Sequence, residues 1–394
     1  MTDLAGTAIA AYRKIYGASP EFVARAPGRV NLIGDHTDYN EGWVLPMAIN
    51  LGTVLAAART PNNALEVHAR RMGESVMVPI GGELPAQPRA PWANYLLAVA
   101  DQFRSRGHAL PGLRVLVDGD LPLGAGLSSS ASLEVAFAAL LNEMLGTGLS
   151  RRGVALLAQA AEHSPYVGVQ CGIMDQFASA LPEEPAAVLL DCRTLATRPV
   201  RLPAGDGALV VIDSRRERTL AGSAYNTRRS ECEEACRALE AASGVPLAAL
   251  RDVTPAMLDE QGAGLREPLL ARARHVVSEN ERVLRCAEAL EAGNLPEAGR
   301  LFTASHESLA RDYEVSCPEL DTIAETAVGT EGVHGCRMTG AGFGGCAVAL
   351  LEQDALPALR KAVREAFAAR AWEVPHFHPV KPACGVECFR LETA

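Results

Sequence analysis

Apolar residues recur along the chain at intervals that predict helices in three places. The first covers residues 129–145, where spacings of three and four residues put the apolar side chains on one face, and Gly146 ends the pattern. These side chains are Leu133, Phe137, Leu140, Leu141 and Met144. Similar spacing predicts further helices over 267–292 and 354–369.

Short apolar runs bounded by turn residues predict strands. They cover residues 113–117, 188–190, 209–212 and 345–351. Helices and strands therefore mix without the regular β-α alternation of a doubly wound sheet. This arrangement favours an α+β fold.

A Pro- and Gly-rich segment, LPAGDG at residues 202–207, separates two of the predicted strands. The chain has 394 residues, which is enough for two domains. We therefore expect an N-terminal lobe over residues 1–201 and a C-terminal lobe over residues 207–394.

Composition and charge exclude several classes of partner. Apolar residues make up 48% and charged residues 21% of the chain, so it can bury large cores. Its 37 basic and 47 acidic side chains give a net charge of -10, and no basic segment suits a nucleic acid. No apolar run is long enough to cross a membrane, and the start is unlike a signal peptide. With ten thinly spread cysteines, we expect reduced thiols in the cytoplasm.

The segment PLGAGLSSSASLE, residues 122–134, carries the features of a phosphate-binding loop. Small residues let the backbone approach a ligand closely, and serines follow at the start of the first predicted helix. The N-terminus of a helix offers free N–H groups and a positive dipole end to an anion, and serine can ligate Mg²⁺. The alternative is a flexible turn in which serine only caps the helix. The small residues and serines in question lie within Gly124, Ala125, Gly126, Leu127, Ser128, Ser129 and Ser130, to which the family resemblance given below assigns contacts with the ATP phosphates.

A second glycine segment, residues 340–345, reads G-x-G-x-x-G but lies before an apolar strand. The dinucleotide-binding fingerprint requires a helix at that position. We therefore interpret this segment as a tight glycine loop beside a ligand or another loop.

Residues 26–40 concentrate polar side chains between apolar segments. Carboxylates and an imidazole placed close together can hydrogen-bond several hydroxyls, as a sugar requires. The alternative is a solvated polar loop. A further carboxylate, Asp175, is flanked by Ile173, Met174 and Phe177, and Arg29 is a suitable partner for it. That pair could equally be a structural salt bridge.

Near the C-terminus, His376 and His378 form an H-x-H motif close to Cys384. A metal site is one interpretation of this spacing. Histidine and cysteine on a terminal strand without a metal is the other.

Taken together, the motifs resemble those of galactokinases, within the GHMP family of small-molecule kinases. The resembling segments run in order from Ala26 to the end of the chain: GRVNLIGDHTDYN, PLGAGLSSSASLE, CGIMDQ, SAYNTRR and MTGAGFGG. The resemblance implies a two-lobed fold with the active site in the cleft between the lobes. It also implies transfer of the ATP γ-phosphate to the anomeric hydroxyl of D-galactose in the presence of Mg²⁺.

The resemblance further implies a role for each matched residue. Asp175 is the expected catalytic base, and Arg29 stabilises the transferring phosphoryl group and keeps Asp175 ionised. Ser130 and Glu162 are the expected Mg²⁺ ligands, and Trp92 lines the adenine pocket. The expected sugar-binding residues are Asp35, His36, Thr37, Asp38, Gly172 and Tyr225. The loop at residues 340–345 is expected to support the first motif.

Two positions depart from the family pattern. Asp35 stands where galactokinases usually carry Glu, and the spacing from Glu162 to Asp175 is one residue longer than expected. A sister kinase acting on arabinose, a galacturonic acid or N-acetylgalactosamine is therefore an alternative. A non-catalytic galactose sensor is a second alternative, although the phosphate motif is intact. We expect a monomeric enzyme.

Overall fold

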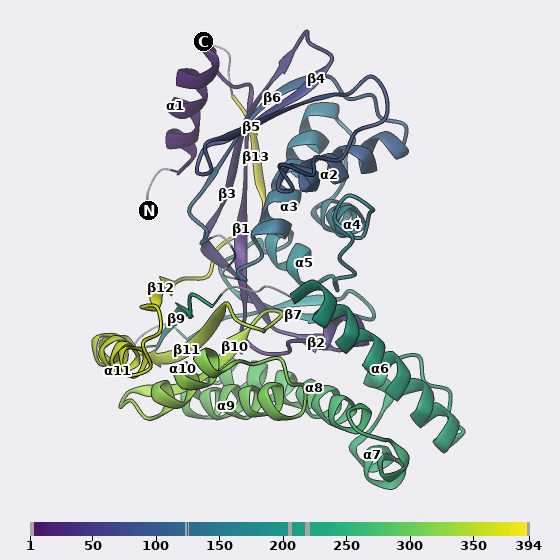
Figure 1. Ribbon diagram of the computed structural model, residues 1–394, viewed down its shortest axis with the longest axis vertical. Helices are drawn as coiled ribbons and strands as arrows, with labels where there is room; N and C mark the ends of the chain where they lie inside the picture. Colours follow the sequence, from purple (N-terminus) through teal and green to yellow (C-terminus); the bar gives the residue numbers. More distant parts are fainter. Residues whose placement is uncertain (1–3, 123, 125, 204–206, 217–220, 392–394) are drawn as a thin grey trace.

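The computed structural model describes residues 4–122, 124, 126–203, 207–216 and 221–391. They form two lobes, each built around its own β-sheet (Figure 1). The first lobe lies at the top of the view, and most of the second half of the chain lies below it. Among the described residues, no helix combines the length and the apolar character needed to cross a membrane.

The first lobe contains a nine-stranded sheet whose main path runs β13-β1-β3-β6-β4-β5, with β2, β7 and β8 joined beside β3. Its neighbours pair antiparallel except β4 and β6, which are parallel. The strands are β1 (Phe22–Asn31), β2 (Trp43–Val44), β3 (Pro46–Thr60), β4 (Ala64–Ala69), β5 (Glu74–Pro79), β6 (Gly112–Gly119), β7 (Ala187–Asp191), β8 (Thr197–Val200) and β13 (Glu387–Arg390).

Helices cover both faces of this sheet (Figure 1). One face carries α1 (Leu4–Tyr16), and the other carries α2 (Ala93–Ser105), α3 (Ser129–Leu145), α4 (Arg151–Glu162) and α5 (Met174–Ala180). The first predicted helix is confirmed with both of its bounds. It is buried on more than the predicted face, since Ala131, Val135 and Ala138 are buried as well. Sheet and neighbouring helices therefore surround α3, whose start lies at the functional site.

The second lobe contains a four-stranded antiparallel sheet of order β10-β11-β9-β12. Its strands are β9 (Gly207–Asp213), β10 (Val333–Thr339), β11 (Cys346–Glu352) and β12 (His376–Val380). Its helices are α6 (Ala221–Ser243), α7 (Pro255–Gln261), α8 (Leu269–Glu291), α9 (Leu295–Arg311), α10 (Pro318–Val328) and α11 (Leu356–Ala368).

Short 3₁₀ turns occur in both halves of the chain. They are η1 (Asp38–Asn40), between β1 and β2, and then η2 (Leu250–Asp252), η3 (Gly262–Gly264) and η4 (Gln353–Ala355).

The other predicted elements are also confirmed, with bounds that differ by a few residues. The predicted strands correspond to β6, β7, β9 and β11, and the two later helices correspond to α8 and α11. In the predicted boundary turn, residues 204–206 lie outside the described residues, and β9 begins at Gly207. The sequence assigned all of 207–394 to the second lobe, whereas β13 pairs with β1 in the first sheet.

An apolar core joins the two lobes. Leu32 and Met47 of the first lobe belong to the same buried cluster as Val211, Val283 and Val348 of the second. Protein interiors are closely packed and resist compression. This shared cluster therefore holds the two lobes in a fixed position on either side of the cleft.

Candidate active site

A cavity of about 820 Å³ lies between the lobes. Residues from all five of the family-like motifs line it together. They include Arg29 and Asp38 of the first motif, Ser128 and Ser130 of the phosphate loop, Asp175, and Gly340 of the glycine loop. Segments more than 300 residues apart in the sequence therefore meet at one site.

The phosphate loop leads into α3 through left-handed backbone conformations. Gly124 has φ 74°, Gly126 has φ 80°, and Ser128, the N-cap residue of α3, has φ 57°. Ala125, predicted to contact phosphate, lies outside the described residues. A non-glycine residue in this conformation is strained and is typical of functional sites. The loop leaves the N-terminus of α3 directed at the cavity that Ser129 and Ser130 line.

Arg29 and Asp175 form the predicted ion pair, and its geometry is bidentate. Arg29 Nε donates to Asp175 Oδ1 and Arg29 Nη2 donates to Asp175 Oδ2, both at 2.8 Å. Arg29 Nη1 also donates to the Gly126 carbonyl at 2.8 Å. The guanidinium thus joins β1, the phosphate loop and α5. A planar, permanently charged group suits this fork geometry.

Asp175 is more open than its apolar neighbours in sequence suggested. Its side chain is 28% exposed, whereas that of Arg29 is 5% exposed. The hydroxyl of Ser128 donates to Asp175 Oδ2 at 2.5 Å. Ser128 makes no side-chain cap to its own helix, because the hydroxyl is directed at this carboxylate. Asp175 therefore faces the cavity with its orientation fixed by two side chains.

Asp35 is held by the second lobe. Its side chain is 1% exposed, Arg337 Nη2 donates to Oδ2 at 2.5 Å, and the Gly340 N–H donates to Oδ1 at 3.0 Å. Burial raises the pKa of Asp35 above its usual range, and Arg337 opposes that rise. The contact with Gly340 confirms that the glycine loop supports the first motif.

The glycine loop itself connects β10 to β11 in an antiparallel hairpin. This connection confirms that it is no dinucleotide fingerprint, since no helix follows it. Gly342 has φ 78°, and a Cβ built there would lie 2.2 Å from the Val315 carbonyl. Glycine is therefore required at position 342, where this loop passes the segment between α9 and α10.

His36 uses both ring nitrogens within the protein. Nε2 lies 3.2 Å from the Ala341 carbonyl, which can only accept, so Nε2 carries the proton and Nδ1 accepts from the Tyr39 hydroxyl at 2.8 Å. The ring lies 4.9 Å from that of Tyr313 and 5.5 Å from that of Tyr225, centroid to centroid. Burial lowers the pKa of His36 to about 3, so the imidazole is neutral.

Thr37 is the one sugar-binding candidate that the structure places away from the cavity lining among the described residues. Its hydroxyl is buried and bonds to the carbonyls of Gly34 and Trp43 at 2.8 and 2.7 Å. These contacts of the hydroxyl hold the loop together, and a contact of Thr37 with the sugar stays a prediction.

Asp38 and Gly172 form one wall of the cavity. A Cβ built on Gly172 would lie 1.9 Å from Asp38 Oδ2, so only glycine admits this carboxylate. Burial, and then the nearby charge of Asp175, raises the pKa of Asp38 to about 7. Tyr225 completes the wall, and burial together with Asp38 raises its pKa well above the usual value.

Glu162 lies on the opposite side of Asp175, at the end of α4. Its Oε2 accepts from Gln176 Nε2 at 2.5 Å and from the Cys171 thiol at 3.3 Å, and the Ser130 side chain also hydrogen-bonds it. Burial, reinforced by Asp175, raises the pKa of Glu162. A second carboxylate, Glu134 of α3, is fully buried, and neither of its oxygens has a hydrogen-bond partner in the described part of the chain.

This arrangement fits a hard divalent cation. Buried carboxylates repel one another, and a cation beside Glu162 and Ser130 would compensate them with the oxygen ligands that Mg²⁺ prefers. Burial and the charge of Glu162 raise the pKa of Glu134 well above its usual value, and a nearby cation would oppose that rise. Ser130 and Glu162 are therefore suited to hold Mg²⁺.

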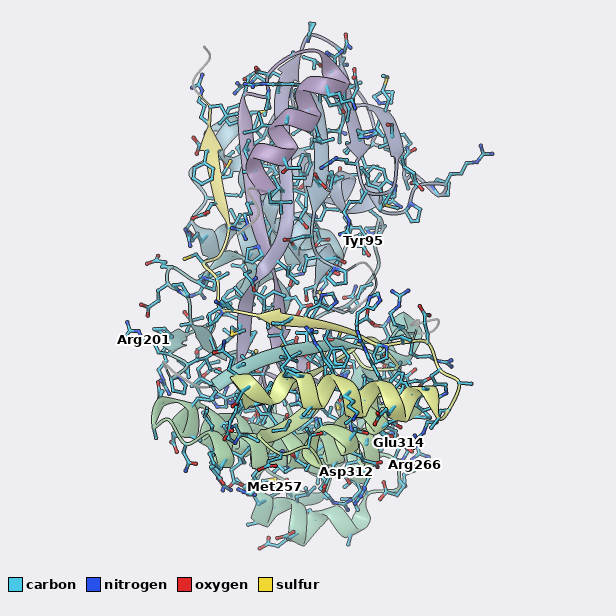
Figure 2. The ribbon with its side chains drawn as sticks, turned by 90° about the vertical axis from the view of Figure 1, so that its left-hand side faces the viewer. Tyr95, Arg201, Met257, Arg266, Asp312 and Glu314 are labelled. Carbon is cyan, nitrogen blue, oxygen red and sulfur yellow. The ribbon has the colours of Figure 1, made fainter. Side chains whose placement is uncertain are left out.

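A smaller, mostly apolar cavity of about 170 Å³ adjoins the phosphate loop. It shares Ser129, Ser130 and Tyr95 with the main cavity, and Trp92 and Leu133 line it as well. Tyr95 lies in the part of the first lobe that faces the second lobe (Figure 2). An apolar slot beside a phosphate loop suits a planar base.

Residues of the second lobe that the sequence reasoning missed hold the first motif in place. Glu279 of α8 accepts from the Gly34 N–H at 3.0 Å, and His275 Nε2 lies 3.2 Å from the Asp35 carbonyl. Burial alone would raise the pKa of Glu279. Arg282 and other positive groups lie close, however, and lower this pKa to about 2. One signal was available: Glu279 falls among Val276 and Val283, on an apolar face of its helix.

Comparison with known proteins decides the family. The chain matches the galactose-binding signature of galactokinases over residues 10–59. It is 46% identical over 357 residues to the galactokinase of Roseiflexus sp. (strain RS-1), covering 90% of each chain. It is 45% identical over 364 residues to that of Chloroflexus aurantiacus, covering 92% of each.

The chain belongs to the galactokinase family. It also matches the N-terminal domain of GHMP kinases over residues 94–183 and their C-terminal domain over 286–369. As a galactokinase family member it is an ATP-dependent sugar kinase with the GHMP kinase fold.

Solved structures agree with this placement. The crystal structure of Lactococcus lactis galactokinase complexed with galactose superposes with a TM-score of 0.90 at 34% identity, over 97% of this chain and 99% of that one. The mevalonate kinase of Methanococcus jannaschii, at 16% identity, has a TM-score of 0.65 over 92% and 98% of the two chains. The latter likeness shows the shared fold alone.

Proposed function

We propose that this galactokinase family member transfers the γ-phosphoryl group of ATP to the anomeric hydroxyl of D-galactose. The products are galactose 1-phosphate and ADP. The observation that carries the proposal is the fork between Arg29 and Asp175, which faces a cavity bounded by the N-terminus of α3 and by the wall at Asp38.

Asp175 acts as the general base. Its Oδ2 accepts from Arg29 and Ser128, whereas Oδ1 accepts from Arg29 alone among the described residues. A carboxylate oxygen can accept two hydrogen bonds, so Oδ1 retains a site for the anomeric hydroxyl. The proton moves to Oδ1, the sugar oxygen bonds to the γ-phosphorus, and the bond to the β-phosphate oxygen breaks as ADP leaves.

Charge on the transferring group is neutralised by fixed elements. The N–H groups at the start of α3 and the guanidinium of Arg29 are aimed at the cavity before any ligand arrives, so they need no reorganisation during the reaction. Ser130 and Glu162 would hold Mg²⁺, which neutralises phosphate charge when bound. The residues proposed to contact ATP phosphates are Gly124, Ala125, Gly126, Leu127, Ser128, Ser129 and Ser130.

Asp38, the Gly172 backbone and Tyr225 are proposed to contact sugar hydroxyls. His36 and Asp35 line the same cavity, although both already have partners in the protein. We propose that Asp35, one methylene shorter than the usual Glu, contacts the sugar through a remaining lone pair or a bridging water. Trp92 is proposed to pack against adenine in the adjoining slot.

None of the ten cysteines, all within the described chain, forms a disulfide. Because free thiols suit a reducing compartment, we propose that the enzyme works in the cytoplasm. We propose separately that it is a monomer.

Comparing sugars as phosphoryl acceptors tests the proposal. ADP release is followed with Mg²⁺, ATP and one of D-galactose, arabinose, galacturonic acid and N-acetylgalactosamine. We expect galactose to give the highest kcat/KM by about tenfold or more. A higher value with another sugar would contradict the assigned substrate. Binding of ATP and galactose without turnover would show a sensor in place of an enzyme.

A further inference from the structure

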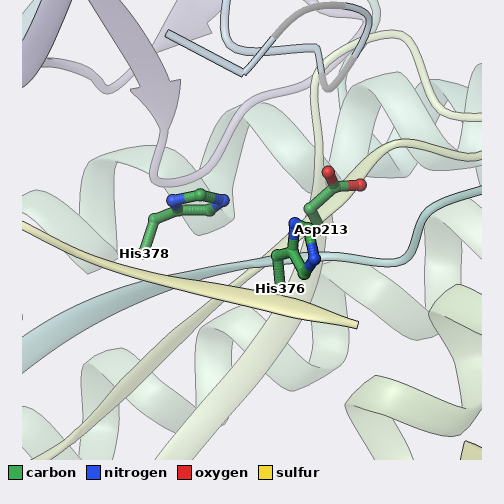
Figure 3. Close-up of side chains that lie close together, drawn as sticks. All are labelled: Asp213, His376 and His378. Carbon is green, nitrogen blue, oxygen red and sulfur yellow. The ribbon is translucent and has the colours of Figure 1, made fainter. Parts of the chain in front are cut away.

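Three side chains that have no role in the proposed reaction gather at the edge of the second sheet, where Asp213 also lines the rim of the main cavity. Asp213 ends β9, and His376 begins the edge strand β12. The strands pair with Asp213 directly opposite His376. Because alternate residues of a strand point to the same side, His378 shares that face (Figure 3).

The three groups are arranged as metal ligands. Each offers one ligand atom, and these atoms all lie within 4.8 Å of one another. Two imidazoles and a carboxylate form a donor set typical of transition metals, with further positions open to water. In the sequence, the H-x-H motif lies close to Cys384, and a metal site was one of two interpretations of that spacing. In the structure its thiol donates instead to the Glu183 carbonyl at 3.5 Å.

A second observation points to a missing ligand. Nε2 of His378 is buried and has no hydrogen-bond partner among the described residues. Buried polar atoms in proteins nearly always have a partner, and a metal ion would supply one.

The Asp213 carboxylate is also held in a fixed orientation that suits a metal ligand. Asp213 is 6% exposed, and its Oδ1 accepts the Arg215 N–H at 2.9 Å, which orients the group. His376, by contrast, is exposed and can rotate. Ligands bound at about 2.0 to 2.2 Å in a tetrahedral site lie roughly 3.4 Å apart, so rotation of His376 would close the set around an ion.

We propose that Asp213, His376 and His378 bind one transition-metal dication, for which Zn²⁺ is the best match to the donors. These residues differ from the proposed Mg²⁺ ligands Ser130 and Glu162, and their nitrogen donors do not suit Mg²⁺. An ion there would cross-link β9 to the edge strand β12. From β12 the chain runs on to β13 in the first sheet, so the ion would secure the segment that links the lobes.

The test measures metal binding directly, without nucleotide or sugar. The parent protein, His376→Ala, Asp213→Asn and the control His108→Ala are dialysed against ZnCl₂, with excess Mg²⁺ to occupy hard-ligand sites. Asparagine keeps an acceptor for Arg215, and His376 is exposed, so both variants should fold. We expect His376→Ala and Asp213→Asn to lose one equivalent of Zn²⁺ that the parent and His108→Ala retain.

Two further readouts exclude binding by the cysteines and a loss of structure. Co²⁺ in the same site should show visible bands without a thiolate charge-transfer band. Zn²⁺ should raise the Tm of the parent and of His108→Ala, but not that of His376→Ala. Equal zinc content in all four proteins, or a thiolate band that accounts for all bound Co²⁺, would overturn the proposal.

Discussion

Ser128 illustrates how one side chain is diverted from a structural role to a functional one. It occupies the N-cap of α3, yet its hydroxyl bonds Asp175 and does not cap the helix. Ser150, by contrast, is the N-cap residue of α4 and caps its helix: its hydroxyl oxygen accepts a hydrogen bond from the Gly153 N–H at 3.2 Å. The two serines therefore form a matched pair for mutation.

Ser128→Ala should lower kcat by about tenfold to hundredfold, because a hydrogen bond to a charged group contributes roughly 1.5 to 3 kcal/mol. Ser150→Ala should lower the free energy of unfolding by about 1 kcal/mol and leave kcat within about twofold of the parent. Steady-state kinetics and urea denaturation measure both quantities. Equal kcat values in the two variants would show that the Ser128 hydroxyl does not contribute to catalysis.

Asp38 should make stability depend on pH. Its folded-state pKa of about 7 lies above the ordinary 3.8, so the folded chain keeps a proton that the unfolded chain loses in between. By linkage, this group makes stability fall as pH rises from about 4 to about 7. The free energy of unfolding of Asp38→Asn, relative to the parent, should therefore rise across that window and then level off.

Urea denaturation between pH 4 and 8 checks this, with Asp259→Asn as a control at an exposed carboxylate of α7. A difference between Asp38→Asn and the parent that stays constant across the pH range would refute the assignment.

The elements around the site depend on close approaches that only glycine permits. The segment between α4 and α5 passes Asp38 at Gly172, where a methyl group would displace the carboxylate. Gly172→Ala should raise the KM for galactose about tenfold or more while the protein remains folded. Gly82→Ala is the matched control, since a Cβ there meets nothing within 4 Å. Unchanged KM in Gly172→Ala would exclude this wall from sugar binding.

Sequence patterns predicted the elements better than their contacts. The period of 3.6 residues identified α3 and α8, and the motif residues Arg29 and Asp175 were paired in advance because a buried carboxylate needs a partner. The short cross-lobe contacts of Arg337 and Glu279 were not predicted, since they join segments more than 240 residues apart. The resemblance assigned Thr37 to the sugar. The hydrogen bonds of its hydroxyl to the Gly34 and Trp43 carbonyls were not predicted, because a motif does not show which polar groups of a loop turn inward.

At the scale of the whole molecule, a buried ion pair joins the lobes. Arg337 of β10 is 0% exposed and bonds Asp35 as well as the carbonyls of Asn31 and Leu32. Arg337→Met would leave the Asp35 carboxylate buried and unpaired. We expect the free energy of unfolding to fall by about 3 to 5 kcal/mol.

Arg300→Met provides the comparison, because Arg300 and Glu297 form an exposed pair on α9. Because solvent screens such an exposed pair, its loss should lower the free energy of unfolding far less in the same urea titration. If Arg337→Met were no more destabilising than Arg300→Met, the ion pair would not be what holds the first motif against the second lobe.

The central claim is that Asp175 accepts the proton of the anomeric hydroxyl as phosphate is transferred. The direct measurement is single-turnover reaction of ATP and galactose, with the product identified by ³¹P NMR, for the parent, Asp175→Asn and Asp259→Asn. We predict galactose 1-phosphate from the parent and the control, and a rate about 100-fold to 10,000-fold lower in Asp175→Asn with galactose binding retained. An unchanged rate in Asp175→Asn, or phosphate on a different hydroxyl, would contradict the account.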